Sequence, residues 1–157
     1  MNLGLVFLIL HVGGAIVAFG PTFAFPLIGS MGGKEPMHAN FATRVSEAIS
    51  DRIVIPLGLF QAVTGAGLII TRGWNLFATP WLLLAIVLYV IAISTSIFYQ
   101  RPTVNRVIAM TSAPPPPGAA GPPPELLALI QRIQRTGIVL TVLLVSIIVL
   151  MVWKPAF

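Results

Sequence analysis

Four long apolar stretches alternate with more polar segments along the chain. None of these stretches contains Asp, Glu, Lys or Arg, and they cover residues 4–29, 53–71, 80–99 and 136–153. A helix needs about 20 residues to cross the hydrocarbon core of a bilayer, and a helix satisfies its own backbone where water is absent. Barrel strands are shorter and alternate in polarity. The pattern predicts an all-α integral membrane four-helix bundle, a single domain over residues 1–157, in contact with the lipid bilayer.

A cleavable signal peptide is the alternative interpretation of the first apolar stretch. Signal peptides start with a basic region, whereas only Met1 and Asn2 come before this stretch, and its length exceeds a typical hydrophobic region. We therefore expect a retained span.

The segments between the apolar stretches contain further helical patterns. Residues 37–52 have the spacing of an amphipathic helix, which we expect to lie along the cytoplasmic face of the membrane and lead into the second span. Its apolar positions are Met37, Phe41, Val45, Ala48 and Ile49. Residues 103–110 predict a shorter interfacial helix of the same kind. Thr79 followed by Pro80 predicts a capping hydroxyl and a proline at the first helical position of the third span.

A proline-rich, low-complexity loop covers residues 113–124. Proline lacks a backbone donor and clashes with the preceding helical turn, so this loop is not helical. We expect a polyproline II spacer, and the alternative is a ligand for a proline-recognition domain. A helix that begins at Glu125 is expected to continue into the fourth span.

The few charged residues predict the orientation of the spans. Charged residues make up 8% of the chain, with a net charge of +5, whereas soluble domains contain about 25%. Seven of the nine basic residues fall in residues 30–52 and 100–135, and only Arg72 and Lys154 fall on the opposite side. By the positive-inside rule, both long loops are cytoplasmic and both termini are outside. The scattered basic residues form no footprint for nucleic acid.

The aromatic residues agree with this orientation. Trp74, Trp81 and Trp153 fall at the predicted outer ends of their helices, while Tyr99 marks the inner end of the third. Trp and Tyr are enriched at membrane interfaces.

Several kinds of chemistry are excluded by composition. The chain has no cysteine, which rules out disulfides, thiolate metal sites and thiol catalysis. Only four acidic residues are present, and no phosphate loop, nucleophile–base pair or His-x-x-x-His pattern occurs. Catalysis by side chains alone is therefore not expected, and the chain is not expected to be an enzyme.

His11 is the one strongly ionisable side chain within the predicted spans. Such residues are costly in lipid, which makes His11 a functional-site hypothesis. Small residues, including Gly14, share its helix face and allow another helix to approach closely. Four polar residues of other spans lie at similar predicted depth and are its expected partners: Thr64, Ser146, Tyr89 and Gln61.

His11 admits two interpretations. A neutral imidazole could hydrogen-bond one of these partners and fix helix packing. Alternatively, it could be an axial ligand of haem b, with Gly14 and Thr64 lining the site. No second histidine or deep methionine accompanies it, so such an iron would be five-coordinate or ligated across a dimer. A copper site built on His11 alone is less favoured, because one ligand does not make a site. His38 is expected to be solvated near the opposite face of the membrane.

Small residues and prolines predict how the helices pack. Gly58, Ala62 and Ala66 form a small-xxx-small stripe typical of close helix contact. Pro56 is expected to kink the second helix, and Pro21 and Pro26 the first.

Two short motifs resemble those of a known family. Leu10-His11-Val12-Gly13-Gly14-Ala15 and Pro56-Leu57-Gly58-Leu59-Phe60-Gln61-Ala62-Val63-Thr64-Gly65 resemble a bacterial family of predicted four-span integral membrane proteins of unknown function. The resemblance covers most of the chain outside the proline-rich loop and implies a multi-pass protein of the bacterial inner membrane. The chain is also distantly similar to copper-resistance D proteins and to protoporphyrinogen oxidase J. The latter resemblance implies a possible haem-binding role for His11, although the further intramembrane histidines and charged residues of those proteins are missing.

Three functions are compatible with the sequence. The first is a non-catalytic structural or accessory subunit, in a homo-oligomer or a larger membrane complex. The second is a haem-binding redox or haem-handling protein that uses His11. The third, a transporter or channel, ranks last because the spans lack acidic residues and no inverted repeat is apparent.

Overall fold

The computed structural model describes residues 2–113 and 121–155, and every regular element within them is a helix. Consecutive helices join into four rods, each long and apolar enough to cross a membrane: Leu3–Lys34, Pro36–Arg72, Pro80–Thr111 and Pro124–Trp153. The predicted all-α membrane bundle with four candidate spans is confirmed.

Three of the four rods are made of successive helical elements. The first comprises α1 (Leu3–Phe19), the 3-10 turn η1 (Gly20–Ala24) and α2 (Phe25–Lys34), and the second comprises η2 (Pro36–His38), α3 (Ala39–Ile49), the π-helical turn η3 (Ser50–Val54) and α4 (Ile55–Arg72). After η4 (Leu76–Ala78), the third comprises α5 (Pro80–Thr95), the π-helical turn η5 (Ser96–Gln100) and α6 (Arg101–Thr111). The fourth rod is the single helix α7 (Pro124–Trp153).

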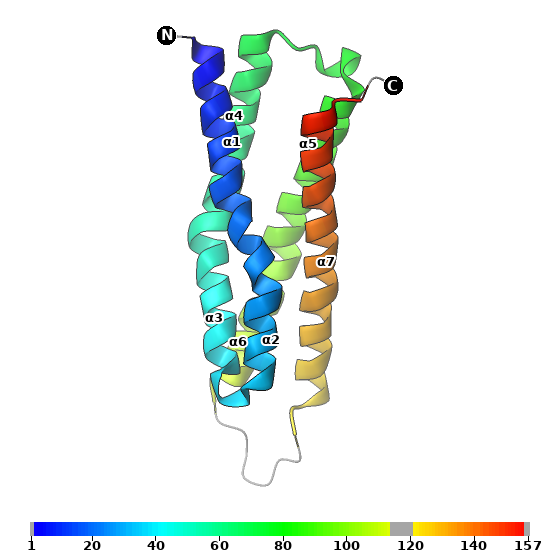
Figure 1. The fold of residues 1–157 in the computed structure, drawn as a ribbon. Coiled ribbons are helices and arrows are strands. Elements are labelled where there is room, and N and C mark those ends of the chain that lie inside the picture. Colours follow the sequence, from blue (N-terminus) through cyan, green and yellow to red (C-terminus); the bar gives the residue numbers. More distant parts are fainter. Residues whose placement is uncertain (1, 114–120, 156–157) are drawn as a thin grey trace.

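The two termini lie at the same end of the bundle, which we call the terminal end (Figure 1). The other end, where α2 leads into α3, where α6 ends and where α7 begins, is the loop end. The arrangement matches the order of spans predicted from the sequence.

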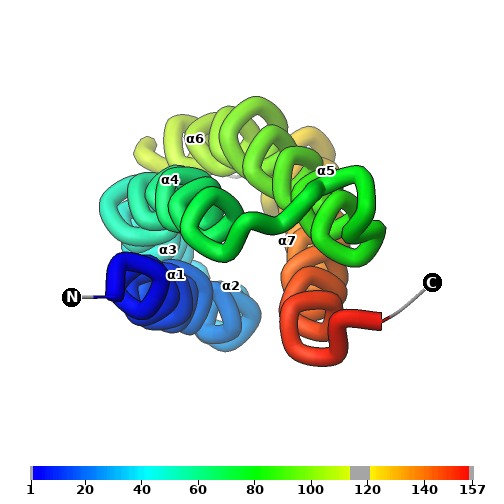
Figure 2. Tube along the Cα trace, turned by 90° about the horizontal axis from the view of Figure 1, so that it is seen from above, coloured from blue at the N-terminus to red at the C-terminus, as the bar shows by residue number. Residues whose placement is uncertain are grey.

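The helices pack as two pairs in the terminal half. There α1 packs on α4 and α5 packs on α7, while α4 and α5 touch only slightly (Figure 2). In the loop half, α3 contacts both α2 and α6, and α6 contacts α7. The two pairs are therefore joined mainly through α3 and α6.

Prolines account for the breaks within three rods. Pro21 occupies the first turn of η1, while Pro56 and Pro102 each lie two residues after a π-helical turn. Proline cannot donate to the carbonyl four residues earlier and its ring crowds that carbonyl, and a wider i→i+5 turn is one way a helix accommodates an interruption. In these turns, the amides of Ile55 and Arg101 bond to the carbonyls of Ser50 and Ser96.

The helix predicted over residues 37–52 is present as α3, but its direction differs from the expectation. It continues through the π-helical turn η3 into α4 without a change of direction. The joined helix of 37 residues is about 55 Å long. A hydrocarbon core is about 30 Å thick. Because α3 runs on along the direction of α4, it lengthens the bundle and does not turn aside as a separate surface helix (Figure 1). The contacts of α3 with α2 and α6 hold it in line.

Two further connections are settled by the structure. Pro80 begins α5 as predicted, but the Thr79 hydroxyl donates to the carbonyl of Asn75 and does not cap α5. Asn75 is itself a cap, whose side chain accepts from the amides of Phe77 and Ala78. Of the predicted proline-rich spacer, residues 114–120 lie outside the described residues.

Candidate functional site

His11 of α1 is paired with Thr64 of α4 in the terminal half. Its Nδ1 lies 2.9 Å from the Thr64 Oγ1, and the Thr64 side chain is almost fully buried, with 1% exposed. The Thr64 hydroxyl also lies 3.3 Å from the carbonyls of both Phe60 and Gln61. When this hydroxyl donates to its own helix, it accepts from His11 Nδ1–H. In that arrangement His11 is the neutral tautomer with the proton on Nδ1 and Nε2 is an acceptor, whereas a hydroxyl that donates to Nδ1 would put the proton on Nε2.

Gly14 lies one turn from His11 on α1 and faces Gln61 of α4. A Cβ added to Gly14 would come within 2.5 Å of the Gln61 Nε2, so glycine makes room for the Gln61 amide. Gln61 is only 5% exposed. Neither its amide nitrogen nor its amide oxygen has a hydrogen-bond partner among the described residues. Gly14 thus acts here as a packing position.

Glycines of α4 face α1 in the same way. A Cβ on Gly65 would lie 3.3 Å from His11 Cε1, and the ring of Phe7 rests directly on Gly67. The face of α4 that packs on α1 therefore carries, in order along the helix, Gln61, Thr64 and the two glycines.

The predicted small-residue stripe is only partly buried. Gly58 is buried, but Ala62 and Ala66 are exposed, so the prediction that this stripe forms the helix contact is wrong. The polar Gln61 and Thr64 are costly to place against lipid, and turning them inward rotates the two alanines outward.

None of the other expected partners is hydrogen-bonded to His11, and the Gln61 side chain is unpartnered among the described residues. The Tyr89 hydroxyl donates to the carbonyl of Gly58 over 2.9 Å and links α5 to α4. Ser146 lies on α7, which packs on α5 and α6. His38 is exposed at the loop end with its Nδ1 3.0 Å from Glu35 Oε2, far along the bundle from His11.

A second polar cluster, which the sequence analysis did not identify, lies between α3 and α6. The Arg101 Nη2 donates to Asp51 Oδ2 over 2.8 Å, and Arg101 Nε lies 3.9 Å from Glu47 Oε1. Burial, together with the negative charge of Asp51, raises the pKa of Glu47 to about 7 despite the nearby Arg101. The hydrogen bond that Arg101 donates to the Asp51 carboxylate raises the pKa of Arg101. The signal in the sequence was the i, i+4 spacing of Glu47 and Asp51, which are two of the four acidic residues of the chain.

A third cluster gathers at the terminal end. The rings of Trp74 and Trp81 meet edge to face with centroids 5.6 Å apart. The Lys154 ammonium lies 5.8 Å from the first ring and 5.9 Å from the second. Because Lys154 directly follows α7, this cluster fastens α7 to the α4–α5 connection.

These groups support hydrogen bonding and ligation by a single imidazole. Within residues 2–113 and 121–155, no group of three or more His, Cys, Asp or Glu side chains is placed to hold a metal ion. Of the three predicted site residues, His11 is the one whose side chain has a nitrogen able to ligate a metal. Thr64 orients its ring, and Gly14 lies one turn away.

The comparisons with known proteins agree with this architecture. The family described as "Predicted integral membrane protein (DUF2269)" matches residues 5–155, which confirms the resemblance to a four-span family of unknown function. No curated protein and no solved structure matches the chain. The distant similarity to copper-resistance D proteins and protoporphyrinogen oxidase J stays a prediction.

Proposed function

The chain belongs to the DUF2269 family of integral membrane proteins, and on that premise we propose that it is a non-catalytic structural or accessory subunit of a membrane complex. The observation that carries the proposal is the use of its intramembrane polar groups. His11 bonds to Thr64, and Tyr89 bonds to the Gly58 carbonyl. These groups join helices, as expected of a packing element.

The surface of the bundle supports association with another protein or a second copy. The accessible surface is 10165 Å², whereas a folded soluble monomer of 16.8 kDa exposes about 7,700 Å². Lipid covers much of this excess. The exposed alanines of α4, Ala62 and Ala66, give a smooth face on which a second helix can approach closely.

The proposed setting is the inner membrane of a bacterium, with both termini outside and the loop end in the cytoplasm. The seven-to-two distribution of basic residues supports this orientation.

Oligomeric state in native-like membranes tests the subunit proposal. The protein is extracted with its lipid in polymer nanodiscs and its mass is measured. We expect a dimer, a higher oligomer or a complex with a second protein, weakened by Ala62→Leu with Ala66→Leu. Gly13→Leu is the matched control, because no atom lies within 4 Å of a Cβ at that position of α1. A monomer without protein partners contradicts the proposal.

A haem-binding role for His11 is the second candidate, favoured by the geometry of the imidazole. Thr64 fixes Nδ1, which leaves Nε2 available as a ligand, and metal-ligating histidines are held by a hydrogen bond at the other nitrogen. His11 is the residue that would hold such a group, and the bound haem would supply the redox chemistry that the side chains lack. The test is a Soret band in the gently purified protein that disappears in His11→Ala.

A further inference from the structure

The contact between α3 and α6 is a defined seam that joins the two helix pairs in the loop half. Val104 and Val107 of α6 are buried. At its end nearest the loops, the Asn40 amide donates to the carbonyl of Ile108 and to the Thr111 hydroxyl, over 3.1 and 2.8 Å. At its other end lies the carboxylate cluster of Glu47, Asp51 and Arg101.

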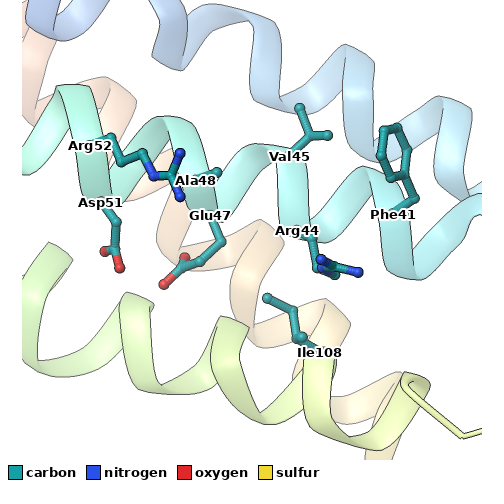
Figure 3. A pocket seen from close by; sticks show the side chains of 8 residues that line it. All are labelled: Phe41, Arg44, Val45, Glu47, Ala48, Asp51, Arg52 and Ile108. Carbon is teal, nitrogen blue, oxygen red and sulfur yellow. The ribbon is translucent and has the colours of Figure 1, made fainter.

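Within the described residues, Arg101 is the one cation that forms ion pairs with the two acidic groups of the carboxylate cluster. Glu47 and Asp51 project from successive turns toward α6 (Figure 3), and Arg101 is hydrogen-bonded to Asp51 alone. The Glu47 side chain is 12% exposed. Glu47 Oε1 and Asp51 Oδ1 are buried and have no hydrogen-bond partner among the described residues. Two buried acceptors therefore lack a donor, and a single proton would supply one.

We propose that Glu47 is a proton-operated clamp: its protonated form holds the α3–α6 seam closed, and its ionised form loosens the seam. This inference is independent of the subunit proposal, because it concerns contacts within one chain.

The charges around Glu47 determine how the clamp responds. On its own rod, Arg44, Asp51 and Arg52 line the same open groove of about 460 Å³ (Figure 3). Across the seam, α6 presents Arg101, while Arg106 is paired with Glu125 of α7. On the other side, α2 carries Lys34 as its last residue. The arginines stay charged at all accessible pH values, and Glu47 carries the raised pKa, at about 7.

The direction of the pH effect follows from that pKa. The folded protein holds the Glu47 proton more tightly than the unfolded chain, in which a glutamate titrates near pH 4.5. The contribution of Glu47 to the free energy of unfolding is therefore greatest below about pH 4.5. It is lost as the pH rises through about 7 and then stays constant. Above that range, the ionised Glu47 is a buried carboxylate that has lost its hydration and lies near the negative charge of Asp51, so a looser seam that readmits water lowers the cost of that charge.

The test measures the width of the seam at two pH values. The chain has no cysteine, so Ala48→Cys and Ala109→Cys, at exposed positions of α3 and α6, place one spin label on each side. Pulsed electron–electron resonance is recorded in nanodiscs at about pH 5.5 and about pH 8.5, on either side of the Glu47 pKa. We expect a narrow distance distribution at the lower pH and a longer or broader one at the higher pH.

Three variants in the labelled background make the test specific. Glu47→Gln keeps the shape of the side chain but cannot ionise, so we expect the narrow distance distribution at both pH values. We expect the melting temperature of the wild type to fall by a few degrees between the two pH values, and that of Glu47→Gln to stay unchanged. Asp51→Asn frees Arg101 for Glu47 and should also remove the response in this range. Glu125→Gln, in the exposed Arg106 pair, is the matched control and should keep it. The proposal is overturned by equal distributions at both pH values in the labelled wild type, by a response that persists in Glu47→Gln, or by a response lost in Glu125→Gln.

Discussion

Gly67 determines how closely α1 and α4 approach, because the Phe7 ring lies where a Cβ would be. We expect Gly67→Ala to reduce the free energy of unfolding by about 1–3 kcal/mol, since the ring must move within a close-packed contact. Gly13→Ala is the matched control, because a Cβ there meets no atom within 4 Å. Unfolding by detergent titration measures both variants, and equal effects would contradict the importance of the Phe7–Gly67 contact.

Substitutions of His11 separate its two possible roles. If His11 only packs, His11→Leu should cost about 0.6 kcal/mol, the average for hydrogen bonds between membrane helices. The cost stays small because the Thr64 hydroxyl keeps the carbonyls of its own helix as acceptors. His11→Gln should be milder still.

Haem ligation predicts a different outcome for the same two variants. An amide cannot replace the imidazole nitrogen, so glutamine and leucine would both abolish Soret absorbance and lower the melting temperature by removing a ligand of the folded state. We expect the mild outcome. A coloured wild type that both substitutions bleach would contradict this expectation.

At this scale, depth along the spans could be predicted from the sequence, but rotation about the helix axis could not. Counting residues from the span ends placed Thr64 among the partners of His11, and the structure pairs the two. The same counting could not exclude Ser146, because it gives no information on which helices are neighbours. The stripe of Ala62 and Ala66 was misassigned because small residues are common in membrane helices, whereas Gln61 and Thr64 determine the buried face.

At the scale of elements, the C-terminal end of α7 is fastened by Lys154 to Trp74 and Trp81. We expect Lys154→Met to reduce the free energy of unfolding by about 0.5–1 kcal/mol, because a neutral side chain loses the attraction to the rings. Lys34→Met, at the end of α2, is the matched control. Tryptophan fluorescence during detergent unfolding reports both stability and the environment of the cluster. Equal stability in the two variants would show that the lysine does not fasten α7.

The elements themselves were largely predictable, and their junctions were not. Long apolar runs define the spans, and Pro21 and Pro56 marked breaks that the structure contains. The direction of α3 depends on η3, a π-helical segment that joins α3 to α4 in one continuous helix. It also depends on the contacts of α3 with α2 and α6. Such contacts are tertiary and leave no local trace in the sequence. The carboxylate cluster left a partial signal, the i, i+4 spacing of Glu47 and Asp51, but its third member Arg101 is brought to them only when α3 and α6 meet.

At the scale of the whole molecule, the two helix pairs are held together at few places. In the terminal half, α5 meets α4 where Tyr89 bonds to the Gly58 carbonyl, and in the loop half α3 and α6 form the seam. Because the α3–α6 seam is the larger of these two links, charges located in it can affect the spacing of both pairs. The seam and the Gly58 contact are therefore the places where a change in the relative position of the pairs would be absorbed.

Orientation in the membrane is the property of the whole molecule that the charges predict. The loop end carries seven of the nine basic residues, so we expect it in the cytoplasm and both termini outside. Because the natural chain has no cysteine, Ala78→Cys near the terminal end and Ala113→Cys at the loop end each give a single exposed thiol. A membrane-impermeant maleimide should label position 78 in cells with a permeabilised outer membrane and position 113 only after the inner membrane is opened. The unsubstituted protein is the control for background labelling. Labelling at position 113 but not at position 78 in cells with an intact inner membrane would reverse the orientation, and with it the side on which the α3–α6 seam meets changes in pH.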